Sequence, residues 1–228
     1  MRWTQRFEHV FKRKQPLLED PVPIEINNAD NALNDILNQL NLKMLIIADT
    51  HGCLSIEEIP TEQFDVCLLL GDVYDCDLRL IKEVVIDMPI YGVLGNHDGF
   101  SALDMQQIRN IHEDVVSVKN VTIAGMQGSL RYKNSDMPLY TDEESKEIAN
   151  LLCDADILIS HDSPKFLHSI NDYAHSGLQG ITDYCEKHNI KLNIHGHHHE
   201  NSTHLLENGT VSVCCYGVRV LKGDNYAK

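Results

Sequence analysis

The sequence has no long apolar run, and this excludes a membrane-spanning helix, which needs roughly 18 consecutive apolar residues. Its basic N-terminus lacks the apolar segment of a signal peptide, so we expect a cytoplasmic protein. Basic side chains are few: 19 Lys and Arg face 34 Asp and Glu, for a net charge of −15. This acidity argues against a stable complex with duplex nucleic acid. It does not exclude a small phosphate ester, because bound metal ions reverse the local field.

The sequence also lacks a CxxC motif, and its seven cysteines are an odd number. These two features favour reduced, mostly buried thiols over a disulfide framework or a zinc knuckle. Histidine, in contrast, is abundant, with 13 residues. Several histidines follow apolar runs directly, where a purely structural role does not account for them.

Residues 1–42 are predicted to form an N-terminal helical extension and linker, ahead of one domain over 43–228. Residues 1–14 have the pattern of a basic amphipathic helix, which we interpret as a cap on the core. A surface or partner anchor is the alternative. Residues 15–28 contain three prolines and are typical of a linker, and 29–41 repeat leucine and isoleucine at helical spacing.

From Lys43 the pattern alternates between strand and helix, which indicates a layered α/β domain with helices outside the sheets. Thr141 and Glu144 form a predicted capping box, and Asn208-Gly209 predicts a type I′ hairpin among added antiparallel strands. The predicted strands are 44–48, 65–70, 90–94, 115–118, 121–125, 155–160 and 191–194. The predicted helices are 78–86 capped by Asp77, 102–110 capped by Ser101, 142–152 and 177–187.

Five predicted strands end in polar side chains that can bind metals. The clusters are Asp49 with His51, Asp72, Asn96 with His97, His161, and His197 with His199. In an open α/β sheet ligands bind at the carboxyl ends of the strands, so we expect these groups to meet. One metal site cannot use them all, whereas two adjacent sites can. Imidazole, carboxylate and amide ligands together suit manganese, iron or zinc.

The polar clusters form five motifs: Asp49-x-His51, Gly71-Asp72, Gly95-Asn96-His97-Asp98, His161 and Gly196-His197-x-His199. They occur in the order found in the calcineurin-like metallophosphoesterases, which the chain resembles over about 43–220. The resemblance implies a four-layer α/β/β/α sandwich of two mixed β-sheets flanked by helices. It also implies a dinuclear metal site at the C-terminal edge of the strands.

The resemblance further implies which residues hold two divalent transition-metal ions. Asp49, His51 and His199 would bind one metal. Asn96, His161 and His197 would bind the other, and Asp72 would bridge the two. Manganese is the first expectation, with iron, zinc, nickel and magnesium as alternatives.

The implied activity is hydrolysis of phosphomonoester or phosphodiester bonds in a small or flexible substrate, by in-line attack of a metal-bridging hydroxide. His97 would be the general acid, and Asp75 matches the acid that orients it, with Asp98 as the alternative. Asp162 is a candidate for orienting His161. His175 is a candidate for contacting the ligands or the substrate, or a helix-start residue.

Departures from the family pattern narrow the assignment. The segment after Asp72 lacks the Arg-Gly of the Ser/Thr phosphoprotein phosphatases. The UDP-diacylglucosamine hydrolases have arginine at the position of His97, which argues against that branch. The retromer scaffold subunit lacks the catalytic histidine, so the presence of His97 favours an active enzyme. The alternatives are a nuclease of the same fold and a metal-binding scaffold, and an oligomer remains open.

The other histidines are expected to be less involved. His198 is interpreted as a surface residue or a neighbour of the ligands, because alternate residues of an extended loop point to opposite sides. His195 flanks the ligands. The remaining five, His9, His112, His168, His188 and His204, are interpreted as ordinary surface residues.

Overall fold

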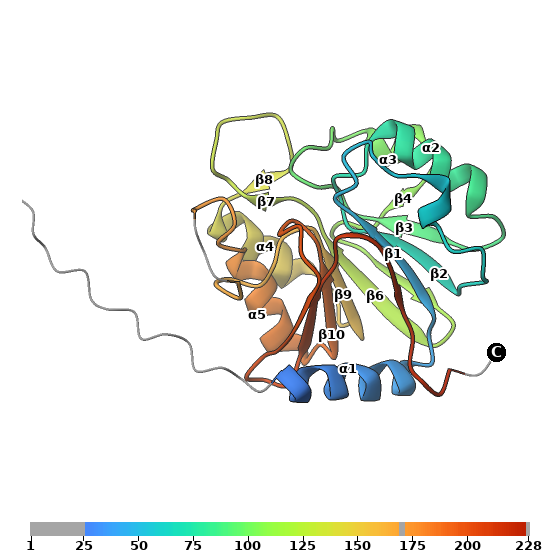
Figure 1. Ribbon diagram of the computed structural model, residues 1–228. Helices are drawn as coiled ribbons and strands as arrows, with labels where there is room; N and C mark the ends of the chain where they lie inside the picture. The colour runs from blue at the N-terminus through green and yellow to red at the C-terminus, as the bar shows by residue number, and fades with distance from the viewer. Residues whose placement is uncertain (1–25, 169–171, 227–228) are drawn as a thin grey trace, which may run out of the picture.

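Two large mixed β-sheets pack face to face, and helices cover their outer faces (Figure 1). The structure, a computed structural model, describes residues 26–168 and 172–226. The helix predicted over 1–14 and most of the predicted linker lie outside these residues. Among the described residues no helix is long and apolar enough to cross a bilayer.

The first sheet has the order β13-β1-β2-β3-β4, in which only β13 is antiparallel. Its strands are β1 (Met44–Ala48), β2 (Val66–Leu69), β3 (Ile90–Gly92), β4 (Arg109–Asn110) and β13 (Gly217–Leu221). The carboxyl ends of β1, β2 and β3 therefore share one edge.

The second sheet has the order β11-β12-β10-β9-β6-β5, with antiparallel strands at both margins. Its strands are β5 (Val115–Val118), β6 (Val121–Met126), β9 (Ile157–Ser160), β10 (Leu192–His195), β11 (Ser202–Leu205) and β12 (Val211–Cys214). A small parallel pair joins β7 (Ser129–Leu130) to β8 (Leu139–Tyr140). The antiparallel additions predicted from the sequence are confirmed.

The side chains of β1 show why its apolar run is continuous. Ile46 packs into the core between the sheets, whereas Leu45 and Ile47 pack outward with Leu78 and Ile81 of α2. A strand that is buried on both faces needs apolar residues at every position.

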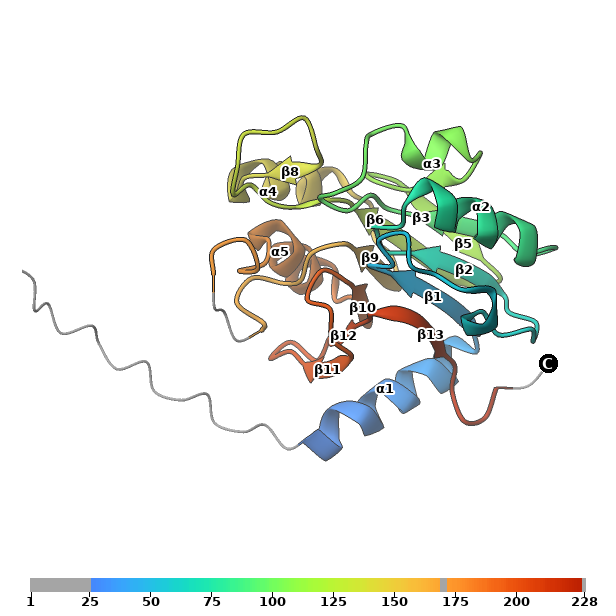
Figure 2. The ribbon, with the colours of Figure 1, turned by 45° about the horizontal axis from the view of Figure 1, so that its top comes forward.

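The helices form the outer layers, as Figures 1 and 2 show: α2 and α3 cover the first sheet, and α4 and α5 cover the second. The predicted capping box is confirmed, since the amide of Glu144 donates to Thr141 Oγ1 at 3.2 Å and the amide of Thr141 donates to Glu144 Oε2 at 2.8 Å. The outer elements are η1 (Ile56–Glu58), α2 (Asp75–Val84), α3 (Ala102–Met105), α4 (Asp142–Leu151) and α5 (Gln179–His188).

Helix α1 (Ile26–Leu40) belongs to the packed body of the protein. Leu33 and Leu37 of α1 join the core between the sheets. On its other side, Asn34 Nδ2 donates to Asp224 Oδ2 at 2.9 Å, which joins α1 to the C-terminal segment. The predicted domain boundary after residue 42 stays a prediction.

One predicted helix differs from the structure at its start, and another differs at its end. α2 begins at Asp75, and Asp77 does not cap it; the Asp77 carboxylate instead accepts from Thr50 Oγ1 at 2.5 Å and from the amide of Gly52 at 2.8 Å. α3 begins at Ala102 after Ser101, as predicted, but it ends at Met105, and the Ser101 side chain makes no capping hydrogen bond.

Two further sequence predictions were wrong in detail. Residues 109–110 form β4, which pairs with β3, so tertiary pairing overrides the helical pattern there. The β11–β12 hairpin is present, but of Asn208 and Gly209 only Gly209 has a positive φ, of 88°. A type I′ turn needs positive φ at both residues.

Candidate metal centre

All seven predicted metal ligands lie just beyond the strands named in the sequence analysis. Asp49 follows β1, Asp72 follows β2, and Asn96 follows β3 in the first sheet. His161 follows β9, and His197 follows β10 in the second sheet. The site therefore lies where the two sheets meet at their carboxyl ends.

The first group consists of Asp49, His51 and His199, whose potential ligand atoms all lie within 4.8 Å of one another. His51 Nε2 is 3.2 Å from His199 Nε2. His199 Nε2 is 3.7 Å from Asp49 Oδ1. These are the three residues that were predicted to bind the first metal.

The second group contains His161, Asn96 and His197. His161 Nε2 lies 2.8 Å from Asn96 Oδ1, and the rings of His161 and His197 have centroids 4.9 Å apart. His197 Nε2 faces the carbonyl oxygen of Ala174 at 3.2 Å, which leaves Nδ1 as its free ligand atom. The structure therefore also gathers the second predicted set.

Asp72 lies between these two groups. Its Oδ2 is 3.8 Å from His51 Nε2 and 3.8 Å from His161 Nε2. Its Oδ1 accepts a hydrogen bond of 2.8 Å from the backbone amide of His97. One oxygen is thus fixed by the backbone, and the other faces both candidate sites.

The fit of these residues to cations is visible at Asp49. Its Oδ1 is buried and has no hydrogen-bond partner. Burial, together with the negative charge of Asp72, raises the pKa of Asp49 to about 8. An unpartnered buried carboxylate oxygen is costly unless a cation accompanies it.

The contact between His161 and Asn96 makes the same point. His161 Nδ1 lies 2.8 Å from the carbonyl oxygen of Leu70, which only accepts, so Nδ1 carries the proton. Burial lowers the pKa of His161 to about 4, so its Nε2 presents a lone pair at neutral pH. Asn96 Nδ2 donates to the hydroxyl of Tyr132 at 3.4 Å, which turns Oδ1 toward His161. Two acceptor atoms 2.8 Å apart are suited to bind one cation together.

The backbone of the site is left-handed at five positions. Asp49, His51, Asp72, His197 and His199 have φ between 48° and 70°. Side chains other than glycine rarely adopt this conformation, and such residues gather at functional sites.

His97 lies beside the first group and is exposed. Its ring meets the His51 ring edge-on, with centroids 5.7 Å apart. Asp75 is not placed against it, because its carboxylate accepts from Gln106 Nε2 at 2.6 Å and pairs with Arg79 at 2.8 Å. The expected pairing of Asp75 with His97 is therefore not formed.

Asp98 does not orient His97 either. Its Oδ2 accepts from the backbone amides of Asp72 at 2.7 Å and Gly95 at 2.8 Å. Burial raises the pKa of Asp98 to about 7. These two bonds hold the ends of β2 and β3 together beside the predicted ligands.

Asp162 does not orient His161, whose Nδ1 faces a backbone carbonyl instead. Its Oδ2 accepts from the amide of Leu130 at 3.0 Å, and Oδ1 accepts from the amide of Ser163 at 2.8 Å. Burial raises the pKa of Asp162. The two hydrogen bonds of its carboxylate tie together the loops below the predicted ligands. Asp162 therefore supports the site through backbone amides and not through His161.

His175 lies next to the ligands. Its ring stacks on His197 with a centroid distance of 4.7 Å and an angle of 26°. Its Nδ1 lies 2.9 Å from the carboxylate of Asp172. It therefore packs directly against one predicted ligand.

Several neighbours of the site were missed by sequence reasoning. Tyr74 meets the ring of His51 edge-on, and Tyr216 stacks on His199 at 5.1 Å. His168 and His195 are buried, although His168 was interpreted as a surface residue. No local pattern could reveal them, because their contacts join distant segments.

The chain matches the calcineurin-like phosphoesterase family over residues 42–201, and it belongs to that family. Membership supports a metal-dependent phosphoesterase in general terms, a hydrolase that acts on phosphoester bonds. A curated relative, an uncharacterized protein of Haemophilus influenzae, is 28% identical over 201 residues, which cover 71% of this chain and 85% of that protein.

Solved structures show the same fold. A protein of Thermus thermophilus has a TM-score of 0.58 at 16% identity, covering 77% of this chain and 89% of that chain. Phosphopantetheinyl hydrolase of Mycobacterium tuberculosis has a TM-score of 0.57 at 13% identity, covering 82% of this chain and 98% of that chain. At these identities the likeness shows the fold alone.

Proposed function

We propose that this protein hydrolyses phosphomonoester or phosphodiester bonds of a small or flexible substrate, using two divalent metal ions and His97 as the proton donor. One observation carries the proposal. Asp72 Oδ2 lies 3.8 Å from the Nε2 atoms of both His51 and His161, one from each ligand group. A carboxylate oxygen in that position is suited to bridge a metal pair.

The residues that would hold the ions are those that the geometry gathers. The first ion would take Asp49, His51 and His199, the second Asn96, His161 and His197, with Asp72 shared. When bound, the two ions would supply the positive charge and the activated water that hydrolysis at phosphorus needs. The mixed imidazole and oxygen ligands favour manganese, with iron or zinc next.

His97 suits the transfer of a proton to the leaving oxygen. Its backbone amide is held by Asp72 at 2.8 Å, so the imidazole stays beside the ligand groups while it remains exposed. Imidazole exchanges protons readily near neutral pH. Since neither Asp75 nor Asp98 contacts the ring, its position comes from the backbone and from the edge contact with His51.

Aromatic side chains at the rim favour a substrate with an organic group attached to the phosphate. Tyr74 and Tyr216 contact ligand histidines and are themselves exposed, and the exposed Tyr132 accepts a hydrogen bond from Asn96. Exposed aromatic rings offer apolar faces to a planar or apolar group. The net charge of −15 argues against a polyanionic substrate such as duplex nucleic acid.

The test is turnover of p-nitrophenyl phosphate and bis-p-nitrophenyl phosphate by protein loaded with Mn²⁺. We expect hydrolysis of at least one, its loss with a chelator, and its return when Mn²⁺ is added back. Fully loaded protein that turns over neither compound, nor any of a panel of natural phosphoesters, would show that the fold serves as a scaffold.

A further inference from the structure

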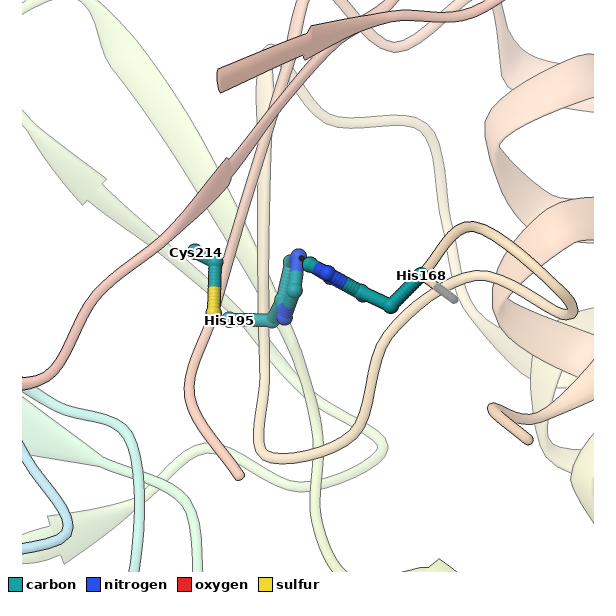
Figure 3. Close-up of side chains that lie close together, drawn as sticks. All are labelled: His168, His195 and Cys214. Atoms are coloured by element: carbon teal, nitrogen blue, oxygen red, sulfur yellow. Dashed lines mark hydrogen bonds between the residues drawn. The ribbon is translucent and has the colours of Figure 1, made fainter. Parts of the chain in front are cut away.

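A second cluster of metal-binding side chains lies outside the seven ligands. His195 ends β10, Cys214 ends β12, and the two residues are register partners on adjacent parallel strands. His168 reaches them from the segment between β9 and α5. Figure 3 shows the two imidazole rings approaching each other, with the thiol of Cys214 beside His195. The potential ligand atoms of the three residues lie within 4.8 Å of one another.

The hydrogen bonds of the two imidazoles fix where their protons are. His195 Nδ1 lies 3.2 Å from the carbonyl oxygen of Gly196, and His168 Nδ1 lies 2.9 Å from Glu200 Oε1. Both partners are acceptors, so each Nδ1 carries the proton of a neutral ring. Each Nε2 then presents a lone pair, yet the two Nε2 atoms are 3.4 Å apart. Two lone pairs in that arrangement repel unless a metal ion or a shared proton lies between them.

The spacing matches a known coordination geometry. Tetrahedral Zn²⁺ with Zn–N bonds of about 2.0–2.1 Å places two ligand nitrogens about 3.3–3.4 Å apart. Histidines that bind metals usually donate their other N–H to a carboxylate or a backbone carbonyl, and both kinds of partner occur here. A thiolate in the set selects zinc or Cu(I) over magnesium and calcium.

The three side chains are shielded from solvent. His195 and Cys214 are fully buried, and His168 is 8% exposed. The ring of His198 stacks on His168 with centroids 3.9 Å apart, which holds the His168 ring in place. The alternative set of His168, Glu200 and His204 is more exposed.

We propose that His168, His195 and Cys214 bind one thiophilic cation, with Zn²⁺ as the expected ion, at a structural site separate from the dinuclear centre. Binding displaces the thiol proton to solvent. The ion would fasten the segment between β9 and α5 to the ends of β10 and β12. That segment carries Ala174 and His175, which contact His197. The site would therefore hold in place the residues that pack against His197, one ligand of the proposed dinuclear centre.

Cobalt substitution of the full-length protein tests this proposal, because only a cysteine ligand gives a thiolate-to-cobalt charge-transfer band in the near ultraviolet. None of the seven ligands of the proposed dinuclear centre contains sulfur, so that centre cannot produce the band. We expect the band on titration with Co²⁺ and its bleaching by Zn²⁺. We also expect zinc-loaded protein to hold one more metal equivalent than Cys214→Ser.

The variants separate the ligands from neighbouring groups. Cys214→Ser abolishes the band. His168→Gln weakens it, and because His168 lies on a loop, this variant serves as the test if Cys214→Ser does not fold. Glu200→Gln lowers the cobalt affinity about 10–100-fold, as expected for a residue that orients a ligand. Cys53→Ser, beside His51, and Cys215→Ser leave the band unchanged. Wild-type protein that gives no band, or a band that survives both Cys214→Ser and His168→Gln, overturns the site and leaves a shared proton between the rings. The failure of the phosphatase assay would not affect this result.

Discussion

The backbone amide of His197 donates a hydrogen bond of 2.9 Å to Asp49 Oδ2, across 148 positions of the chain. This bond joins the carboxyl ends of β1 and β10, and therefore the two sheets. The other oxygen of the same carboxylate is buried without a partner. One side chain thus fixes the geometry of the site and still offers an oxygen to a cation.

Asp72→Asn should weaken occupancy of both proposed metal sites, because the shared carboxylate loses its charge while the amide oxygen can still accept from His97. Metal content after dialysis measures the effect. Asp104→Asn, on the exposed side of α3, is the matched control. Two full equivalents in Asp72→Asn would contradict the bridging position.

His97→Ala should keep both metals and lose about 10²–10⁴-fold in turnover, the usual loss for a proton donor. Metal analysis and kcat for p-nitrophenyl phosphate measure the two effects separately. Phe100→Ala, which removes an exposed ring three residues later in the chain, is the control. A variant that retains the wild-type rate would remove His97 from the mechanism.

Gly95→Ala should destabilise the fold by about 1–3 kcal/mol or more and empty the metal centre. A Cβ at this position would lie 2.1 Å from Asp72 Oδ1 and 2.5 Å from the backbone nitrogen of Asp72. Gly99→Ala, four residues later, meets nothing within 4 Å and should be nearly neutral. Urea unfolding of both variants gives the comparison, and equal midpoints would refute the steric argument.

Acid should destabilise the metal-free protein through His112. Burial lowers the pKa of His112 to about 4, against 6.5 for the free side chain. Its Nδ1 accepts from the amide of Gln127 at 3.3 Å, and a proton there would break that bond. Between pH 6.5 and about 4 the unfolded chain binds more protons, so stability falls as the pH falls, by at most about 1.4 kcal/mol per pH unit.

The measurement is urea unfolding with a chelator at several pH values in this range. His112→Asn keeps an acceptor for Gln127 but cannot titrate, so its stability should depend less on pH. Tyr140→Phe removes the partner of Nε2 and leaves the titration, so its pH dependence should resemble the wild type. A wild-type slope in His112→Asn would assign the acid sensitivity to other groups.

The elements that the sequence predicted well are those with continuous apolar runs. β1 was predicted at its observed bounds, since residues 44–48 are buried on both faces and are followed at once by polar ligands. The candidate metal ligands could be predicted because each follows such a strand and their spacing matches a family.

The failures arose where tertiary contacts decide. Asp75 was expected against His97, but Arg79 and Gln106 take its carboxylate. Asp77 was expected to cap a helix, but it binds the loop that carries His51. The burial of His168 depends on strands that lie far along the chain, so no local pattern could predict it.

The left-handed backbone at five of the predicted metal ligands affects how the site should be probed by mutation. An alanine scan would remove each side chain but leave a Cβ in a conformation that disfavours it. At His199, with φ of 51°, glycine removes the imidazole and accepts the conformation without that penalty. Glycine variants at these positions should therefore remain better folded than alanine variants while they lose the metal equally.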